Sequence, residues 1–267
     1  LKDCETVVFV GGISPQLEGE EMPIEISGFK GGDRTNIELP KVQRNFLKAL
    51  KEAGKKVVFV NCSGSAIALT PETESCDAIL QAWYPGQEGG EAVARVLFGE
   101  YNPAGKLPIT FYKNSEQLPD FKDYSMKGRT YRYMNDALFP FGYGLSYTSF
   151  RMGDATLSNS ILKKGEKITL KVPVSNVGKK DGTEIVQVYV KDPADTEGPL
   201  KSLKAFERVE VKAGKTAEAV ITLDSRNFEL FDAATNTVRA KAGKYEVYYG
   251  SSSADKDLKK LDVSIEY

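Results

Sequence analysis

TVVFVGG at residues 6–12 and KVVFVN at residues 56–61 are the stretches that decide the fold of the first part of this chain. Each is apolar and rich in β-branched residues, as expected of a strand buried on both faces. Between them, Pro40 opens a pattern with helical spacing of the apolar residues Val42, Phe46, Ala49, Leu50 and Ala53. A third apolar run, DAILQAW, follows at residues 77–83, and a second helical pattern lies at 89–98. This alternation predicts an α/β/α sandwich with a mostly parallel sheet.

From about Arg151 onward, apolar and polar residues alternate with a period of two. Turn residues separate the runs of this kind, which are KITLKVPVSNVG, EIVQVYVKD, SLKAFERVEVKAG, TAEAVITLD and KYEVYYG. Their spacing predicts an antiparallel β-sandwich of immunoglobulin or fibronectin type III character. We therefore expect an α/β domain at residues 1–150, including a connector at about 101–150, and a β-sandwich at residues 151–267.

The composition of the 267 residues is that of a globular protein, with 41% hydrophobic and 27% charged residues. No apolar run approaches the roughly 18 residues of a membrane span, so membrane insertion is not expected. Lys and Arg number 36 against 37 Asp and Glu, and the net charge of −1 disfavours a nucleic-acid partner. The chain has no histidine, which excludes Ser-His-Asp and Cys-His catalysis. Acid–base chemistry therefore falls to carboxylates, Tyr or Lys.

Cys4, Cys62 and Cys76 are odd in number and show no C-x-x-C spacing, so neither a disulfide framework nor a metal site is indicated. Cys4 and Cys62 lie beside apolar runs and are interpreted as small buried hydrophobic residues. No cofactor is expected, because GQEGG at residues 86–90 lacks the Lys and Ser/Thr of a phosphate loop. The chain enters a strand pattern almost at once, without an initiator Met, and is interpreted as a piece of a longer protein.

Several longer segments carry a spacing of Gly, Pro, acidic and aromatic residues that is more specific than any of these patterns. They are LEGEEMPIEISGFKGGDRTNIELP, AWYPGQEGGEAVARVLFGEYNPAGKLPITF, KGRTYRY and LFPFGYGLSYTSF, of which the second and fourth are the most specific. Through these segments the chain resembles glycoside hydrolase family 3 over essentially its whole length, and within it the bacterial β-glucosidases and β-xylosidases. The resemblance implies the family's second, α/β-sandwich domain, followed by its fibronectin type III-like domain.

The family's first domain is a (β/α)8 barrel that contributes the nucleophilic Asp and most of the sugar-binding pocket. Nothing in this sequence forms eight βα units. The resemblance therefore implies one part of a split, cleaved or truncated enzyme, with the barrel as its partner and a β-glycoside or oligosaccharide as its substrate. It also implies a periplasmic or secreted location, and it leaves homo-oligomerisation open.

The acidic loop at residues 17–40 is where the chemistry is expected. A retaining glycosidase needs two carboxyl groups about 5–5.5 Å apart, one of them an acid with a raised pKa. Like charges in proximity raise at least one pKa, and the loop carries Glu18, Glu20, Glu21 and Glu25. The family places its acid/base glutamate here, upstream of an Asp-Arg pair, and Gly19-Glu20 looks like that motif. We expect Glu20 to be the general acid/base, with Glu18 second and Glu21 third. A solvated acidic surface is the other interpretation.

Three residues are candidates for substrate binding, namely Asp33, Arg34 and Trp83. Arg34 either reaches a sugar hydroxyl or a loop carboxylate, or forms with Asp33 a pair that caps and pins the loop. Trp83 and the adjacent Tyr84 offer an apolar ring to a sugar face, although a single Trp at a strand end is more often part of the core.

The resemblance therefore implies the C-terminal part of a retaining, exo-acting β-glycosidase that supplies the general acid/base and is expected to be inactive without the barrel. The alternative is a non-catalytic scaffold or a carbohydrate-binding unit. The acidic loop discriminates between the two, because a scaffold has no reason to concentrate carboxylates after a strand.

Overall fold

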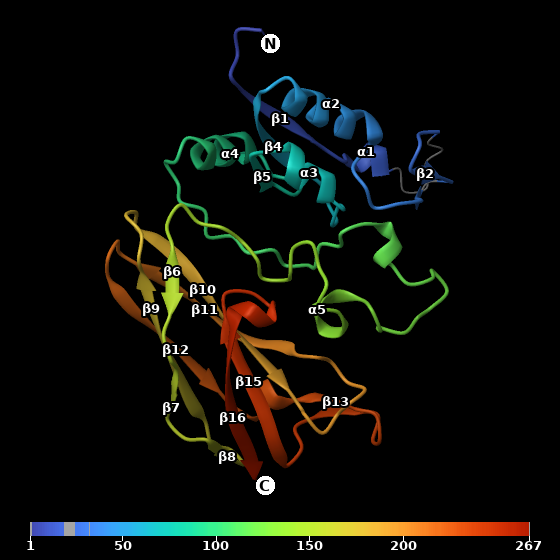
Figure 1. Cartoon of the computed structure of the whole chain (residues 1–267). Coiled ribbons are helices and arrows are strands. Elements are labelled where there is room, and N and C mark those ends of the chain that lie inside the picture. The colour runs from blue at the N-terminus through green and yellow to red at the C-terminus, as the bar shows by residue number, and fades with distance from the viewer. Residues whose placement is uncertain (1, 19–24, 32, 267) are drawn as a thin grey trace. The chain divides into compact units, whose positions relative to one another are not determined.

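The computed structural model describes residues 2–18, 25–31 and 33–266. The chain forms two compact units, which we call the α/β unit and the sandwich unit (Figure 1). The α/β unit comprises Leu1–Phe98, Thr110–Gly128 and Asp136–Phe139, and the sandwich unit comprises Gly99–Ile109, Arg129–Asn135 and Pro140–Tyr267. The segments of the expected connector therefore alternate between the two units.

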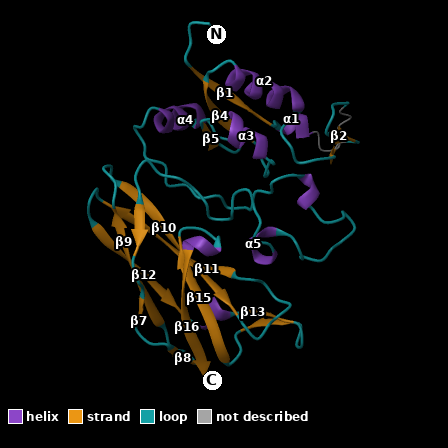
Figure 2. Cartoon of the chain, viewed as in Figure 1, coloured by secondary structure: helices purple, strands orange, loops and turns teal. Residues whose placement is uncertain are grey.

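A parallel sheet with the strand order β1-β4-β5 forms the centre of the α/β unit. Helices follow these strands along the chain, as Figure 2 shows. The predicted parallel α/β class is confirmed. The elements are β1 (Thr6–Gly12), α1 (Pro15–Glu18), β2 (Phe29–Lys30), β3 (Asp33–Arg34), α2 (Lys41–Glu52), β4 (Lys56–Cys62), α3 (Thr70–Ser75), β5 (Ala78–Gln81), α4 (Gly89–Leu97) and a short 3-10 helix at Ser115–Gln117.

Strand β4 lies between β1 and β5 and is buried as its sequence predicts. Val57, Phe59 and Val60 are at most 1% exposed. Helix α2 packs against one face of the sheet, where the ring of Phe46 lies 5.5 Å from that of Phe9. A central strand with neighbours on both sides needs an apolar run throughout, which KVVFVN supplies.

Strand β1 is not buried on both faces, contrary to the expectation from its apolar sequence. Val8 is 50% and Val10 64% exposed, whereas Phe9, on the other face, packs against Phe46 and Phe59. Among the described residues only β4 pairs with β1, so β1 is an edge strand. An apolar pattern shows that both faces of a strand are suited to burial. The described part of the chain provides packing partners for only one face of β1.

Helix α2 begins directly after Pro40, as predicted, but it does not bury all of the predicted apolar positions. Leu50 is buried, while Val42 is 76% and Phe46 41% exposed. Strand β5 is shorter than its apolar run and ends before Trp83. Trp83 has a φ of +58°, in the left-handed region that a strand cannot contain.

Two sheets form the sandwich unit, which confirms the predicted β-sandwich. One has the strand order β11-β10-β15-β16-β8, and the other has the order β12-β9-β6, with β7 also paired to β9. The pairing of β16 with β8 is parallel. The elements are α5 (Thr130–Tyr133), β6 (Phe150–Met152), β7 (Thr156–Leu157), β8 (Ile161–Lys163), β9 (Ile168–Asn176), β10 (Gly182–Lys191), β11 (Ser202–Val211), β12 (Thr216–Leu223), β13 (Leu230–Asp232), β14 (Thr237–Arg239), β15 (Gly243–Gly250), β16 (Leu258–Glu266) and 3-10 helices at Ser225–Phe228 and Asp255–Asp257.

Inward-facing side chains of both sheets form the core of the sandwich unit, with Val172 and Val188 fully buried. On the outer face of the larger sheet, Tyr189 is fully buried as well. Tyr131 and Phe141 stack on each other with ring centroids 4.4 Å apart and lie edge-on to Tyr189. The connector segments of this unit are therefore packed onto the sheet.

Candidate active site

The carboxyl edge of the parallel sheet brings the ends of three strands together. The strand register places Gly12 of β1 beside Cys62 of β4, and Asn61 of β4 beside Gln81 of β5. In α/β proteins the side chains that bind ligands gather beyond this edge. The segments that leave the three strands therefore define the candidate site.

Close backbone contacts hold these segments in place. Gly12 has a φ of +119°, and a Cβ atom there would lie 2.0 Å from the carbonyl oxygen of Cys62. Tyr84, which follows β5, donates a hydrogen bond of 2.9 Å from its hydroxyl to the carbonyl oxygen of Ile13. Its ring covers Gly64, where a Cβ atom would lie 2.6 Å from the ring. Glycines at both positions thus permit the approach that joins the three strand ends.

A chain of polar side chains runs along the same edge. Asn61 is fully buried and donates from Nδ2 to Oε1 of Gln81 at 2.6 Å. Gln81 donates to Oγ of Ser63 at 3.1 Å, and that hydroxyl donates to the carbonyl oxygen of Ser65 at 2.9 Å. Arg34 completes the chain by donating from Nη1 to Oγ of Ser65 at 3.0 Å. Oδ1 of Asn61 is buried and has no hydrogen-bond partner among the described residues.

The acidic loop is attached to this edge at both of its ends. It leaves β1 through the short helix α1, whose last residue is Glu18. It returns through the hairpin β2–β3, in which Phe29 lies opposite Arg34. Of the predicted general acid/base and its alternatives, Glu20 and Glu21 lie outside the described residues. Glu25 is exposed to solvent.

The predicted binding residues do not share one environment. Arg34 is half-buried and lies at the carboxyl edge through its bond to Ser65. Asp33 is exposed on the β2–β3 hairpin. Trp83 is partly buried, and its ring lies edge-on to Phe111 with centroids 6.2 Å apart. The left-handed backbone of Trp83 is strained for a bulky residue, a feature that concentrates at functional sites.

Two features of this region escape the sequence patterns. Glu38 accepts hydrogen bonds from the backbone N–H of Ser115 at 2.9 Å and from its hydroxyl at 2.6 Å. Partial burial opposes the ionisation of Glu38, but the bonds from Ser115 outweigh it and lower the pKa of Glu38. The buried Asn61 is the other feature. A polar residue that ends an apolar strand is the signal that could have found it. Asn61-Cys62-Ser63 matches a glycosylation sequon, but the full burial of Asn61 argues against its modification.

The cysteines differ in burial from the expectation. Cys4 and Cys62 are only partly buried, whereas Cys76 is buried. Cys4 and Cys62 lie near strand ends. The apolar residues next to them in the sequence do not cover their side chains. Burial raises the pKa of Cys76 to about 11, so its thiol is held protonated. Among the described residues, no group of Cys, Asp and Glu is arranged to hold a metal ion.

Residues 1–147, more than half of the chain, match the glycosyl hydrolase family 3 C-terminal domain. The chain belongs to glycosyl hydrolase family 3. Residues 184–253 match a fibronectin type III-like domain and lie within the sandwich unit. The carboxyl edge described above is therefore the edge of a family 3 α/β domain, and the family resemblance carried by the Gly/Pro/aromatic segments is confirmed.

Relatives of this family 3 chain include a xylan 1,4-beta-xylosidase of Xylanibacter ruminicola, 64% identical over 265 residues, and a periplasmic beta-glucosidase of Salmonella typhimurium, 38% identical over 267 residues. These alignments cover 99% and 95% of this chain but 30% and 34% of the two relatives. A beta-glucosidase from Listeria innocua in complex with glucose superposes with a TM-score of 0.81 at 28% identity, over 100% of this chain and 37% of that chain. The chain thus spans about a third of the length of these relatives.

Proposed function

We propose that this chain is the C-terminal part of a retaining, exo-acting β-glycosidase that releases terminal sugars from oligosaccharides. Relatives of the chain are named beta-xylosidase and beta-glucosidase, and the chain spans about a third of their length. In this proposal the acidic loop supplies the general acid/base, while the nucleophilic Asp belongs to a barrel domain outside the sequence described here.

The attachment of the acidic loop is the observation that best supports this proposal. The loop leaves the carboxyl edge of the sheet after Gly12, and the 3.0 Å bond from Arg34 to Ser65 ties it back to the same edge. Both described ends of the loop thus lie at the edge where α/β proteins bind ligands. A merely solvated acidic surface would not need this anchoring.

Glu20 is the proposed acid in the first step and the base in the second. In the first step, the barrel Asp attacks the anomeric carbon while the proton of Glu20 passes to the leaving oxygen, which yields a glycosyl-enzyme and the free aglycone. In the second step, the Glu20 carboxylate takes a proton from water, and the water oxygen displaces the Asp from the anomeric carbon. Nearby carboxylates on the loop favour the protonated form that the first step needs.

Arg34 is proposed to position the loop and to contact a sugar hydroxyl or a loop carboxylate. Its Nη1 atom donates to Ser65 and its Nε atom donates to the carbonyl oxygen of Asn36 at 3.2 Å, so the guanidinium is held at the carboxyl edge, where the proposal places either contact. Trp83 is proposed to offer its ring to a sugar face, because it lies beside the same edge and is only partly buried. Asp33 is exposed and is proposed to bind substrate only together with Arg34.

The exposed face of β1 supports a further portion of the enzyme outside this chain. Val8 and Val10 are exposed on one face of β1, and among the described residues β1 pairs only with β4; proteins normally cover apolar faces and open strand edges of this kind. We propose a periplasmic or secreted location from the similarity to the Salmonella relative. Within the described part of the chain, no helix has the length and apolar character needed to cross a membrane.

The Glu20→Ala variant of the enzyme assembled with its barrel tests the proposal. General acid–base assistance contributes roughly 10²–10⁴ in rate, so hydrolysis of substrates with poor leaving groups should fall by about that factor. Aryl glycosides with acidic phenols need little protonation and should still form the glycosyl-enzyme. That intermediate should then persist, and added azide should accelerate turnover and yield a β-glycosyl azide.

Glu18→Ala and Glu21→Ala provide matched controls on the same loop and should show no azide rescue. Near-normal turnover of natural disaccharides by Glu20→Ala would refute the role of Glu20. Azide rescue of Glu18→Ala in its place would transfer the role to Glu18. If none of the three changes affects turnover, the loop is a solvated surface and the chain is a scaffold or a binding unit.

A further inference from the structure

A cavity of about 270 Å³ opens on the sandwich unit, outside the candidate active site. It lies on the outer face of the larger sheet, where Tyr248 of β15 faces Lys260 of β16. The loops that precede β11 and β16 contribute Leu200, Lys201 and Asp255, and the end of β10 contributes Lys191. Most of the side chains that line the cavity are charged or polar.

Lys201 is the most unusual of these groups, because its side chain is only 4% exposed. An ammonium group has three N–H donors, and a buried charge is stable only when it is paired and hydrogen-bonded. Among the described residues, Lys201 bonds only to Asp255, which is itself largely exposed. Two donors of a buried cation are therefore left for something that enters the cavity.

Lys191 and Lys260 line the same cavity but differ in their contacts. Lys260 donates to Glu246 at 2.9 Å, and the hydroxyl of Tyr248 donates to the other oxygen of that carboxylate at 2.7 Å. Lys191 lies opposite Glu246 in the strand register, and its charge helps to lower the pKa of that carboxyl group, but its ammonium group donates no hydrogen bond to any residue that the structure describes. The cavity thus presents one buried and one partly exposed ammonium group, Lys201 and Lys191, with unused donors.

We propose that this cavity binds a small hydroxylated carboxylate, such as an acidic monosaccharide, with its carboxylate held between Lys191 and Lys201. Charge-assisted hydrogen bonds from ammonium to carboxylate are among the strong ones, and they satisfy the free donors of both lysines. The carboxylate of Asp255 and the amide of Asn135 can take ligand hydroxyls, while Leu200 provides an apolar wall. This site is separate from the proposed glycosidase chemistry and does not depend on it.

The charges around the cavity favour a monoanion over a more highly charged ligand. Three lysines line it together with one aspartate, and Glu246 is held at its border by Lys260 and Tyr248. The excess of positive charge is therefore small, and a dianionic phosphate would meet repulsion from both carboxylates. A neutral sugar would leave the donors of Lys201 without a charged acceptor.

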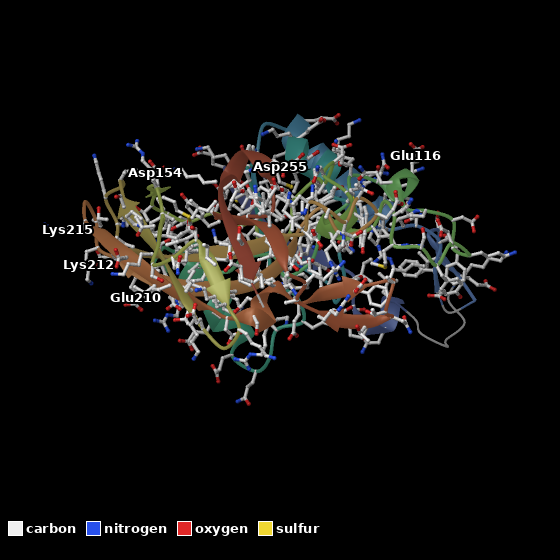
Figure 3. All side chains as sticks on the ribbon, turned by 90° about the horizontal axis from the view of Figure 1, so that it is seen from below. Glu116, Asp154, Glu210, Lys212, Lys215 and Asp255 are labelled. Carbon is white, nitrogen blue, oxygen red and sulfur yellow. The ribbon has the colours of Figure 1, made fainter. Side chains whose placement is uncertain are left out.

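Titration of the isotopically labelled chain with sodium D-glucuronate, followed by NMR at constant ionic strength, tests the proposal. We expect saturable shifts of residues around the cavity and weaker binding of D-glucose and inorganic phosphate. Lys191→Ala should weaken glucuronate binding about tenfold or more, since it removes a charged hydrogen bond. Lys215→Ala is the matched control, because Lys215 is exposed and lies well away from Asp255 (Figure 3).

Lys201→Met should abolish the binding. Because Lys201 is buried, its replacement can also disturb folding, so the decisive test is the Lys191→Ala variant, in which the replaced side chain is partly exposed. Equal affinity of glucose and glucuronate, tighter binding of phosphate, or unchanged binding in Lys191→Ala would each overturn the proposal. Absence of saturable shifts up to high glucuronate concentration would overturn it as well. A preserved spectrum for Lys191→Ala ensures that lost binding is not lost folding.

Discussion

Gly12 shows how one backbone position holds the candidate site together. Its N–H donates to Oε1 of Gln43 at 2.8 Å, and Nε2 of the same side chain donates to the carbonyl oxygen of Gly12 at 2.8 Å. Its φ of +119° and the proximity of the Cys62 carbonyl leave no room for a side chain. The chain passes from this residue through α1 into the acidic loop, so the conformation of Gly12 sets the direction in which this segment leaves the sheet.

Gly12→Ala should destabilise the α/β unit by more than about 2 kcal/mol, since it adds backbone strain to a steric clash. Urea denaturation monitored by fluorescence measures the change. Gly54→Ala is the matched control: Gly54 also has a positive φ, of +72°, but a Cβ atom there would meet no atom within 4 Å. The control should lose only about 1 kcal/mol. Equal losses in the two variants would contradict the argument from the Cys62 contact.

The side chains of the candidate site were only partly predictable from the sequence. The family motif identifies Asp33-Arg34, and the apolar runs identify where the strands end. Glu38 and Ser115 do not stand out, since they lie far apart in the chain and meet only in the folded structure. Hydrogen bonds of this kind depend on tertiary contacts, which a local pattern does not contain.

Strand β1 shows the limit of the same reasoning for a whole element. Its seven residues form a strand, as the apolar run predicts, and each pairs with β4 in parallel register. The expectation of burial on both faces was wrong because burial depends on the neighbours of a strand as well as on its own sequence. For β4, which has both neighbours, the same expectation was right. Helix α2 gives a second example, because Val42 fits its apolar spacing and is nevertheless exposed.

Only β4 pairs with β1 in the part of the chain that the structure describes, and the other edge of β1 should make the isolated chain prone to self-association. We expect the double variant Val8→Lys, Val10→Lys to reduce the associated fraction in sedimentation velocity, because charged side chains on an edge oppose strand pairing. Its free energy of unfolding should change by less than about 1 kcal/mol, since both side chains are at least half exposed already. Val177→Lys is the control: Val177 is 53% exposed but lies outside the strands, so association should not change. Persistent association of the double variant would show that another surface is responsible.

The two compact units are not two continuous stretches of the chain. Segments between residues 99 and 139 alternate between the units, and everything from Pro140 onward belongs to the sandwich unit. In the sandwich unit, Lys106 forms a 2.8 Å ion pair with the buried Glu184, and Tyr131 covers Tyr189. The period-two pattern identified the strands of this unit, but it could not reveal which parts of the connector complete its outer face.

A fragment of residues 151–267 should therefore be less stable than a fragment of residues 99–267. The shorter fragment exposes Tyr189 and leaves Glu184 without Lys106, and together these losses should lower the free energy of unfolding by about 3 kcal/mol or more. Urea denaturation of both fragments, with β-sheet circular dichroism as the signal, provides the measurement. Lys106→Met in the longer fragment isolates the share of the ion pair. Identical midpoints for the two fragments would mean that the connector adds no stability to the sandwich.

The chain on its own should show no glycosidase activity, because the proposed mechanism needs a nucleophile from outside it. One carboxyl group can protonate a leaving oxygen, but retention requires a second that bonds to the anomeric carbon. Nitrophenyl β-xylosides and β-glucosides should therefore release no nitrophenol above background with the purified 267-residue chain.

Addition of a separately expressed barrel portion should restore release if the two parts associate, and the restored rate should saturate with the concentration of the chain. A matched mixture that contains the Glu20→Ala chain separates assembly from chemistry, since it should bind the barrel equally well and yet hydrolyse poor leaving groups slowly. Robust turnover by the chain alone would place a nucleophile within it and remove the need for the barrel.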